Sequence, residues 1–232
     1  EYADRRERYL RLVVEEMIPA VAARGLARFC DSGTAFPADQ TAALYEAARA
    51  HGLGLKVHAD EFRPAGGAEL AAAWEAVSAE HCICSTDEGI AAMAAAGVIA
   101  VLLPGVPLVH GLPGAADARR FIRRGVAVAL GTDFNPSCPI ESMPLVVALA
   151  CYTCHMSPAE ALSAATINAA HAVGRGELVG SLEVGKQADV VVWEVANHKQ
   201  LAERLGGNLV AAIVKSGRLL RVSEGGTAAY GS

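Results

Sequence analysis

Long apolar runs, basic blocks and disulfide patterns are all missing from this sequence. No apolar run reaches the roughly 20 residues of a membrane-spanning helix, so we expect no membrane partner. The net charge is −5 without any long basic block, which argues against nucleic acid as a partner. The six cysteines show no disulfide-framework spacing, and the charged opening Glu1–Arg6 is unlike a signal peptide. We therefore expect a cytoplasmic protein with reduced thiols.

Two motifs that would suggest a cofactor are also missing. No Gly-x-Gly-x-x-Gly follows a predicted strand, which makes nucleotide binding on an open sheet a weak hypothesis. No two of the seven histidines are spaced i, i+2 or i, i+4, so the chain supplies no two-histidine metal cluster of its own. What the 232 residues do contain is a hydrophobic fraction of 53% with only 19% charged residues, which is typical of an α/β enzyme core.

Short apolar runs alternate with helical patterns over the first 130 residues. The predicted strands are Leu26–Cys30, Leu53–Val57, Val77–Cys84, Val98–Leu103 and Val126–Leu130. The predicted helices are 4–24, 37–51, 68–76, 86–96 and 115–124, with Thr86 as the cap of the fourth. Short connections between alternating strands and helices indicate parallel βαβ units. The pattern fits an open doubly wound sheet or part of a (β/α)₈ barrel, and a closed barrel would need three more strands.

The pattern changes after Pro136. Helices are predicted at 140–155 and 157–173, the second opening with the capping box Ser157–Glu160. Gly180–Trp193 and Leu209–Leu220 predict β structure outside the alternation, with a short helix at 198–205 and a Lys-Ser-Gly turn in the second segment. We therefore expect an α/β region over 1–175, a small β subdomain over 176–222 and a flexible tail over 223–232.

Polar residues stand near the carboxyl ends of three predicted strands. Asp133 follows the strand Val126–Leu130, while His58 and His81 belong to earlier strands. An isolated Asp at a strand end more often caps a turn. However, the carboxyl ends of parallel strands converge on one rim, and His, His and carboxylate are ligand types that zinc or iron(II) takes. The sequence therefore predicts a shared metal or catalytic site.

Weaker candidates surround these residues. Glu61, three positions after His58, suits a general acid or base, although a surface charge is the alternative, and Asp60 is a weaker candidate. Cys82 is expected to face the surrounding helices as a small buried thiol. Cys151 and Cys154 have CxxC spacing without a second pair, so a zinc or redox role is a weak hypothesis.

Several motifs together resemble the imidazolonepropionase family of the amidohydrolase superfamily, from about residue 8 to residue 220. They are His58–Phe62, Gly66–Leu70, Ala79–His81, Val101–Gly105, Gly131–Pro136, Glu141–Met143, Ala165–Ala170 and Gly180–Asp189. The resemblance implies a partial (β/α)₈ TIM barrel, strands 4–8, with a small C-terminal β subdomain of the amidohydrolase β-sandwich. It implies opening of the ring amide of 4-imidazolone-5-propanoate to N-formimidoyl-L-glutamate, with one zinc or iron(II) ion.

The resemblance also implies roles for single residues. His58 and Asp133 would be metal ligands, with Asp133 taking part in catalysis. His81 would contact the substrate and Glu61 would be the acid or base near the attacking water. The implied substrate-binding residues are Asn135, Ser137 and Cys138.

The family's first-strand His-x-His pair has no match here, so we expect the isolated chain to be inactive, and to aggregate or to pair with another copy. The expected partners are a small-molecule substrate and, in the full-length form, a second subunit in a homodimer. Two alternatives remain open: another cyclic-amide hydrolase or deaminase of the superfamily, or a non-catalytic subunit with the amidohydrolase fold.

Overall fold

The computed structural model describes residues 5–33 and 36–221. These residues fall into two compact units. The first contains the chain up to Leu102 together with Arg120–Ala127, and the second contains Leu103–Arg119 and the chain from Val128 onward. The tail predicted over 223–232 lies outside the described residues.

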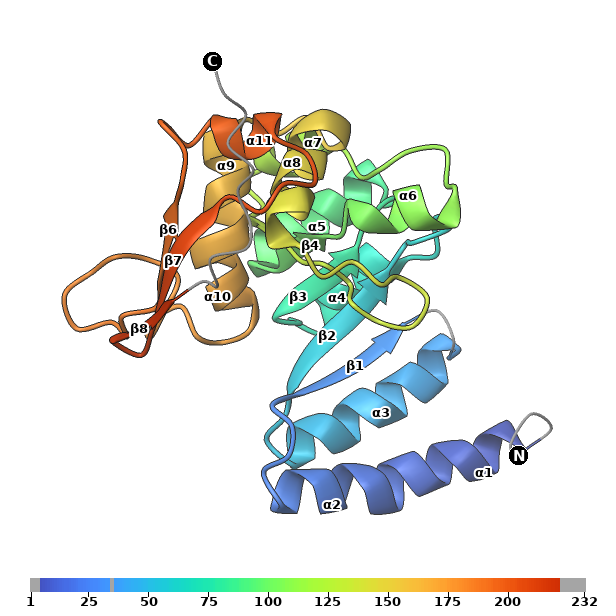
Figure 1. Ribbon diagram of the computed structural model, residues 1–232. Coiled ribbons are helices and arrows are strands. Elements are labelled where there is room, and N and C mark those ends of the chain that lie inside the picture. Colours follow the sequence, from blue (N-terminus) through green and yellow to red (C-terminus); the bar gives the residue numbers. More distant parts are fainter. Residues whose placement is uncertain (1–4, 34–35, 222–232) are drawn as a thin grey trace. The chain divides into compact units, whose positions relative to one another are not determined.

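The first unit contains a parallel sheet whose four strands stand in chain order. They are β1 (Phe29–Gly33), β2 (Gly54–Ala59), β3 (Ser78–His81) and β4 (Ile99–Leu102). Each strand pairs in parallel with the next, as Figure 1 shows for the first three in blue to green. Val57 and Ala79 are fully buried on the face toward the helices. The predicted parallel βαβ arrangement is confirmed for these strands.

Helices precede or follow each strand of this sheet. They are α1 (Arg6–Arg11), the π-helical η1 (Leu12–Met17), α2 (Ile18–Ala23), α3 (Ala38–Ala50), α4 (Gly67–Ala73) and α5 (Asp87–Ala96). The first three are continuous and match the helix predicted over 4–24. α3 lies along β1 and β2 (Figure 1), where the buried Tyr45 hydroxyl donates to the carbonyl of Lys56 at 2.8 Å. The predicted Thr86 cap of α5 is present, because its hydroxyl accepts from the amide of Gly89.

The strand boundaries differ from the sequence prediction. The first strand lies three residues later than predicted, because Leu26 is 61% exposed whereas Asp31 and Ser32 join the ladder with β2. Backbone pairing accepts polar side chains near a strand's carboxyl end, where apolar content is a poor guide. The third strand is shorter than predicted, since His81 and Cys82 have φ of 68° and 55° and leave the extended conformation.

The second unit contains the buried strand β5 (Val128–Leu130) and is otherwise mainly helical up to β6. Its helices are α6 (Gly105–His110), α7 (Ala118–Ile122, which continues into the first unit), α8 (Met143–Thr153), α9 (Pro158–Ser163), the π-helical η2 (Ala164–Asn168), α10 (Ala169–Ala172) and α11 (Gln200–Glu203). The predicted capping box is present, since the amide of Ser157 donates to Glu160 at 2.8 Å. No helix was predicted for the segment that forms α6, because Pro104-Gly105 is a turn signal.

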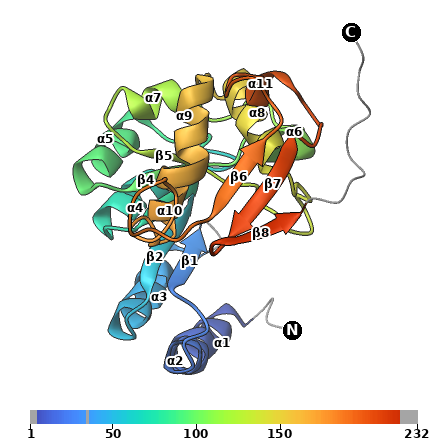
Figure 2. The same cartoon turned by 60° about the vertical axis from the view of Figure 1, so that its left-hand side comes forward.

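Three antiparallel strands complete the second unit (Figure 2): β6 (Val190–Trp193), β7 (Val210–Lys215) and β8 (Arg218–Arg221). The predicted turn is confirmed at Ser216 and Gly217, whose φ values of 50° and 77° suit a tight hairpin. The strand predicted from Gly180 begins only at Val190, because Lys186 holds the preceding turns through Gly176 and Ser181. No helix in the described ranges combines the length and apolarity needed to cross a membrane.

Candidate metal and catalytic site

His58 lies at the carboxyl end of β2, beside the last residues of β1. Its Nδ1 lies 2.9 Å from Oδ2 of Asp31, which is on the same face of the neighbouring strand. The register places Gly33 directly opposite His58. A Cβ at position 33 would come within 2.6 Å of the His58 Cβ, so glycine allows the two strands to hold this histidine between them.

His81 approaches His58 from the end of β3. The register pairs His81 with Ala59, so strict alternation would direct His81 to the opposite face from His58. The left-handed conformation of His81 (φ 68°) ends that alternation, and the two imidazole centroids are 5.0 Å apart. Oε1 of Glu61 lies 3.7 Å from Nδ1 of the buried His81. Three of the predicted site residues therefore gather in the first unit.

Lys56 and Glu80 form an ion pair on the same sheet face. Lys56 is two residues before His58 on β2, and Glu80 lies opposite His58 on β3. Nζ of Lys56 lies 2.9 Å from Oε1 of Glu80 and donates to Ser78 as well. The two charged side chains are only 16% and 12% exposed. The ammonium also lies 5.1 Å from the ring centroid of Phe29, a cation–π contact. This largely buried cluster compensates its own charges.

The ligand atoms of Asp31, His58 and Glu80 all lie within 4.8 Å of one another, close enough to hold a cation. The Lys56 ammonium already neutralises Glu80, however, and it would repel a cation placed there. Imidazole and carboxylate donors at this strand end fit the preferences of zinc or iron(II). The arrangement favours His58 as a ligand and gives Asp31 and Glu80 supporting roles.

Asp60, two residues after His58, has a different environment. It is buried, with φ of 50°, and its carboxylate accepts from the Ser85 hydroxyl at 2.9 Å. It also accepts from three backbone amides near the start of α4, those of Ala65, Gly67 and Ala68, at 2.8 to 3.1 Å. With four donors engaged, Asp60 fixes the turn after β2 and caps α4, which is a structural role.

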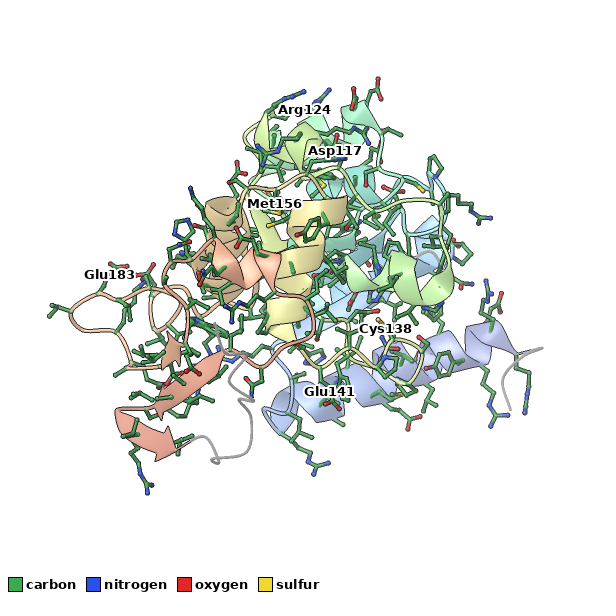
Figure 3. All side chains as sticks on the ribbon, turned by 45° about the horizontal axis from the view of Figure 1, so that its top comes forward. Asp117, Arg124, Cys138, Glu141, Met156 and Glu183 are labelled. Atoms are coloured by element: carbon green, nitrogen blue, oxygen red, sulfur yellow. The ribbon has the colours of Figure 1, made fainter. Side chains whose placement is uncertain are left out.

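The other predicted site residues lie on one loop of the second unit, between β5 and α8, where Figure 3 labels Cys138 and Glu141. They are Asp133, Asn135, Ser137 and Cys138. Asn135 provides the side-chain acceptor of this turn: its Oδ1 accepts from the amide and hydroxyl of Ser137 and from the amide of Cys138, at 2.7 to 3.1 Å. Burial, and then the nearby charge of Asp133, raise the pKa of the Cys138 thiol. The turn-capping role considered for Asp133 thus belongs to Asn135.

Asp133 itself takes a left-handed conformation with φ of 56°, which is uncommon outside glycine. Its backbone carbonyl accepts from Nδ2 of Asn135 at 2.8 Å. Sparsely populated backbone conformations cluster at functional sites. The convergence of Asp133 with His58 and His81 stays a prediction.

The cysteines do not form the alternative site that their spacing suggested. Cys154 is buried, and this burial raises the pKa of its thiol to about 11. Burial likewise raises the pKa of Cys82, which is fully enclosed as predicted. Metal binding and redox chemistry need the thiolate, so both environments disfavour those roles.

Three residues of the cluster were not among the site residues predicted from the sequence: Asp31, Lys56 and Glu80. Asp31 was placed after a strand rather than in one, because the first strand was predicted three residues too early. Lys56 lies in a run that is otherwise apolar, and Glu80 lies between Ser78 and His81. The opposite charges on adjacent predicted strands were the available signal.

Comparison with known proteins defines the class. Residues 31–220 match the model of the amidohydrolase family, and the chain belongs to that family. Solved structures at 19–23% identity share the fold, among them an adenosine deaminase from Xanthomonas campestris with bound zinc (TM-score 0.68, 83% of this chain and 51% of that one). A 5-methylcytosine deaminase from Klebsiella pneumoniae has a TM-score of 0.74 over 91% of this chain and 60% of its own.

Within that family the chain is similar to imidazolonepropionases. It is 50% identical to the imidazolonepropionase of Geobacillus thermodenitrificans (strain NG80-2) over 97% of this chain and 54% of that protein. It is 52% identical to the imidazolonepropionase of Geobacillus kaustophilus (strain HTA426), over 94% of this chain and 52% of that protein. The chain thus spans about half the length of these curated relatives.

Proposed function

We propose that this chain serves as the C-terminal part of an imidazolonepropionase, a hydrolase of histidine degradation. It would open the ring amide of 4-imidazolone-5-propanoate to N-formimidoyl-L-glutamate. The observation that carries the proposal is the cluster of His58, His81 and Glu61 at the carboxyl ends of β2 and β3, in a chain about 50% identical to imidazolonepropionases.

The fold proposal follows the same relationship. Residues 1–175 would supply strands 4–8 of a (β/α)₈ barrel, and residues 176–222 part of the amidohydrolase β-sandwich. The alternation of β1–β5 with helices supports the first part, and the antiparallel sheet of β6, β7 and β8 supports the second.

His58 and Asp133 would hold one divalent ion, zinc or iron(II). Such an ion, when bound, supplies Lewis-acid chemistry, because it lowers the pKa of water from about 15.7 to about 7 and polarises a carbonyl. The imidazole of His58 and the carboxylate of Asp133 are suitable donor types for either metal.

Glu61 would move the proton. Its carboxylate would take a proton from the attacking water as the new C–O bond forms, and would pass it to the ring nitrogen as the C–N bond breaks. His81, next to Glu61, would donate a hydrogen bond to the substrate carbonyl. Asn135, Ser137 and Cys138 would bind the propionate-bearing substrate, with Ser137 hydroxyl and amide groups already ordered by Asn135.

The test measures conversion of 4-imidazolone-5-propanoate by mass spectrometry, with zinc or iron(II) supplied. Three samples are compared: the chain alone, the chain mixed with the part of the Geobacillus thermodenitrificans relative that the match leaves uncovered, and the same mixture carrying Glu61→Gln. We expect activity only in the unmutated mixture, with a loss of at least about 100-fold in the Glu61→Gln sample. Full turnover by the chain alone would refute the proposed division of the site.

The same samples separate the alternatives. Turnover of another cyclic amide or release of ammonia from an aminated ring, without turnover of the imidazolone, would indicate a different amidohydrolase. A mixture that binds no metal would indicate a non-catalytic subunit. We further propose a cytoplasmic homodimer in the full-length form, which light scattering of the reconstituted protein tests.

A further inference from the structure

The face of the sheet that carries His58 presents two carboxylates and two groups able to pair with them. In the register, Asp31 stands opposite Lys56, and His58 stands opposite Glu80. The pairs that form are crossed with respect to this register. Lys56 pairs with Glu80 at 2.9 Å, and His58 pairs with Asp31 at 2.9 Å.

The burial of the Lys56–Glu80 pair explains the crossed arrangement. Both side chains are nearly covered, and an ammonium in that position needs a carboxylate partner. Ser78 adds a further acceptor for the ammonium. Because Glu80 and Ser78 engage Lys56, the Asp31 carboxylate pairs with imidazole instead of ammonium.

A carboxylate at Nδ1 determines which ring nitrogen carries the proton. Neutral imidazole has one donor and one acceptor nitrogen. An ionised carboxylate only accepts, so the proton is placed on Nδ1 and the lone pair on Nε2. Gly33 allows this approach, since a side chain there would displace His58.

We propose that Asp31 is a positioning residue that holds His58 in the Nδ1–H tautomer and directs its Nε2 lone pair toward a divalent cation. The binding of a divalent cation at His58 is part of the proposed function, and the metal part of this inference depends on it. The tautomer is a property of the chain itself and is tested without metal.

The first measurement is the tautomer in the metal-free full chain. Long-range ¹H–¹⁵N correlation spectra, recorded where the ring is neutral, distinguish the two forms, and His58→Gln assigns the signal by its loss. We expect the Nδ1–H form in the unmutated chain and a shift toward the Nε2–H form in Asp31→Ala. Asp31→Glu keeps a carboxylate and restores the Nδ1–H form, while Asp39→Ala, an exposed aspartate of α3, leaves it unchanged.

The second measurement is zinc affinity of the same variants, each mixed with the part of the Geobacillus thermodenitrificans relative that the match leaves uncovered, by competition with a chromophoric chelator. Loss of a carboxylate behind a histidine ligand typically weakens metal binding about 10- to 100-fold. We expect that loss in Asp31→Ala, none in Asp39→Ala, and partial recovery in Asp31→Glu. Circular dichroism identifies any variant whose loss reflects unfolding.

An unmutated chain with His58 in the Nε2–H form, or an unchanged tautomer in Asp31→Ala, would overturn the positioning role. Equal zinc affinity in the unmutated chain and Asp31→Ala would do the same. Expected tautomers in the chain, together with a mixture that binds no zinc, would support the role of Asp31 and count against the metal part of the proposed function, so the two failures are distinguishable.

Discussion

Two polar clusters lie at the carboxyl ends of β2 and β3, and they have opposite environments. Around Asp60 the carboxylate is buried and engages four donors, three of them from the start of α4. Around His58 the groups are more exposed: the His58 side chain is 48% exposed and that of Asp31 34%. The cluster around Asp60 stabilises the fold, and the cluster around His58, whose side chains are accessible to solvent, is the candidate metal site.

Residues that are adjacent in sequence can have different roles, one structural and one a candidate for catalysis. Asp60 and Glu61 are adjacent carboxylates in the same sequence motif. Judged by residue type alone, both are candidates for a catalytic acid or base. The left-handed backbone at Asp60 turns its carboxylate to the helix amides, whereas Glu61 lies beside His81. The four donors bound to Asp60 therefore identify it as a structural carboxylate.

The largest expected effect is that of Asp60→Ala. Four donors would lose their acceptor at about 1–3 kcal/mol each, so the free energy of unfolding should fall by about 4 kcal/mol or more. The matched control is Asp31→Ala, which removes a partly exposed carboxylate paired with the His58 ring and should cost less than about 1 kcal/mol. Urea denaturation measures both, and similar losses in the two variants would remove the distinction between the clusters.

Lys56→Met should have the next largest effect. It leaves the nearly buried Glu80 carboxylate uncompensated, at a cost of about 3 kcal/mol. The double variant Lys56→Met/Glu80→Leu removes both charges and should recover most of this loss. A double variant no more stable than Lys56→Met would show that the pair does not carry compensating charges in the folded chain.

Tyr45→Phe tests a neutral hydrogen bond beneath the same strands. Its hydroxyl donates to the carbonyl of Lys56 at 2.8 Å, so its removal should cost about 1 kcal/mol. Tyr152→Phe changes an exposed hydroxyl and serves as the control, with no expected change. Thermal unfolding of the two variants gives the comparison directly, and an equal change in both would contradict it.

The smallest effect concerns pH and the partly exposed Glu160. Its hydrogen bond with Arg119, together with those from Ser157, lowers its pKa from 4.5 to about 2. A depressed folded-state pKa contributes stability above pH 4.5 that is lost as the pH falls toward 2. Because the side chain is one-third exposed, we expect about 1 kcal/mol or less.

Glu160→Gln keeps the capping geometry and should flatten the acid limb of the stability curve between pH 4.5 and 2. Glu46→Gln, on the exposed side of α3, is the matched control. An acid limb unchanged by Glu160→Gln would show that the Arg119 contact does not contribute in solution.

Local chemistry accounts for what could be predicted. The Thr86 cap, the capping box at Ser157 and the turn at Ser216 and Gly217 depend on residues within a few positions of one another, and all three are present. The alternation of strands and helices could also be predicted from the sequence, because it is a repeated local pattern. The strand starting at Phe29 was misplaced, because its position depends on pairing with β2 across some 25 residues of chain.

The sequence by itself determined the family, the parallel βαβ pattern and the candidate residues His58, His81 and Glu61, since motifs and periodicity are properties of short segments. Only the tertiary structure decided that Asp31 pairs with His58, that Lys56 pairs with Glu80, and that Asp60 is structural. The physical reason is that partner choice depends on register, burial and backbone handedness. A residue in the left-handed conformation, such as His81, directs its side chain away from the sheet face that strand alternation would assign to it. No local sequence pattern predicts that conformation.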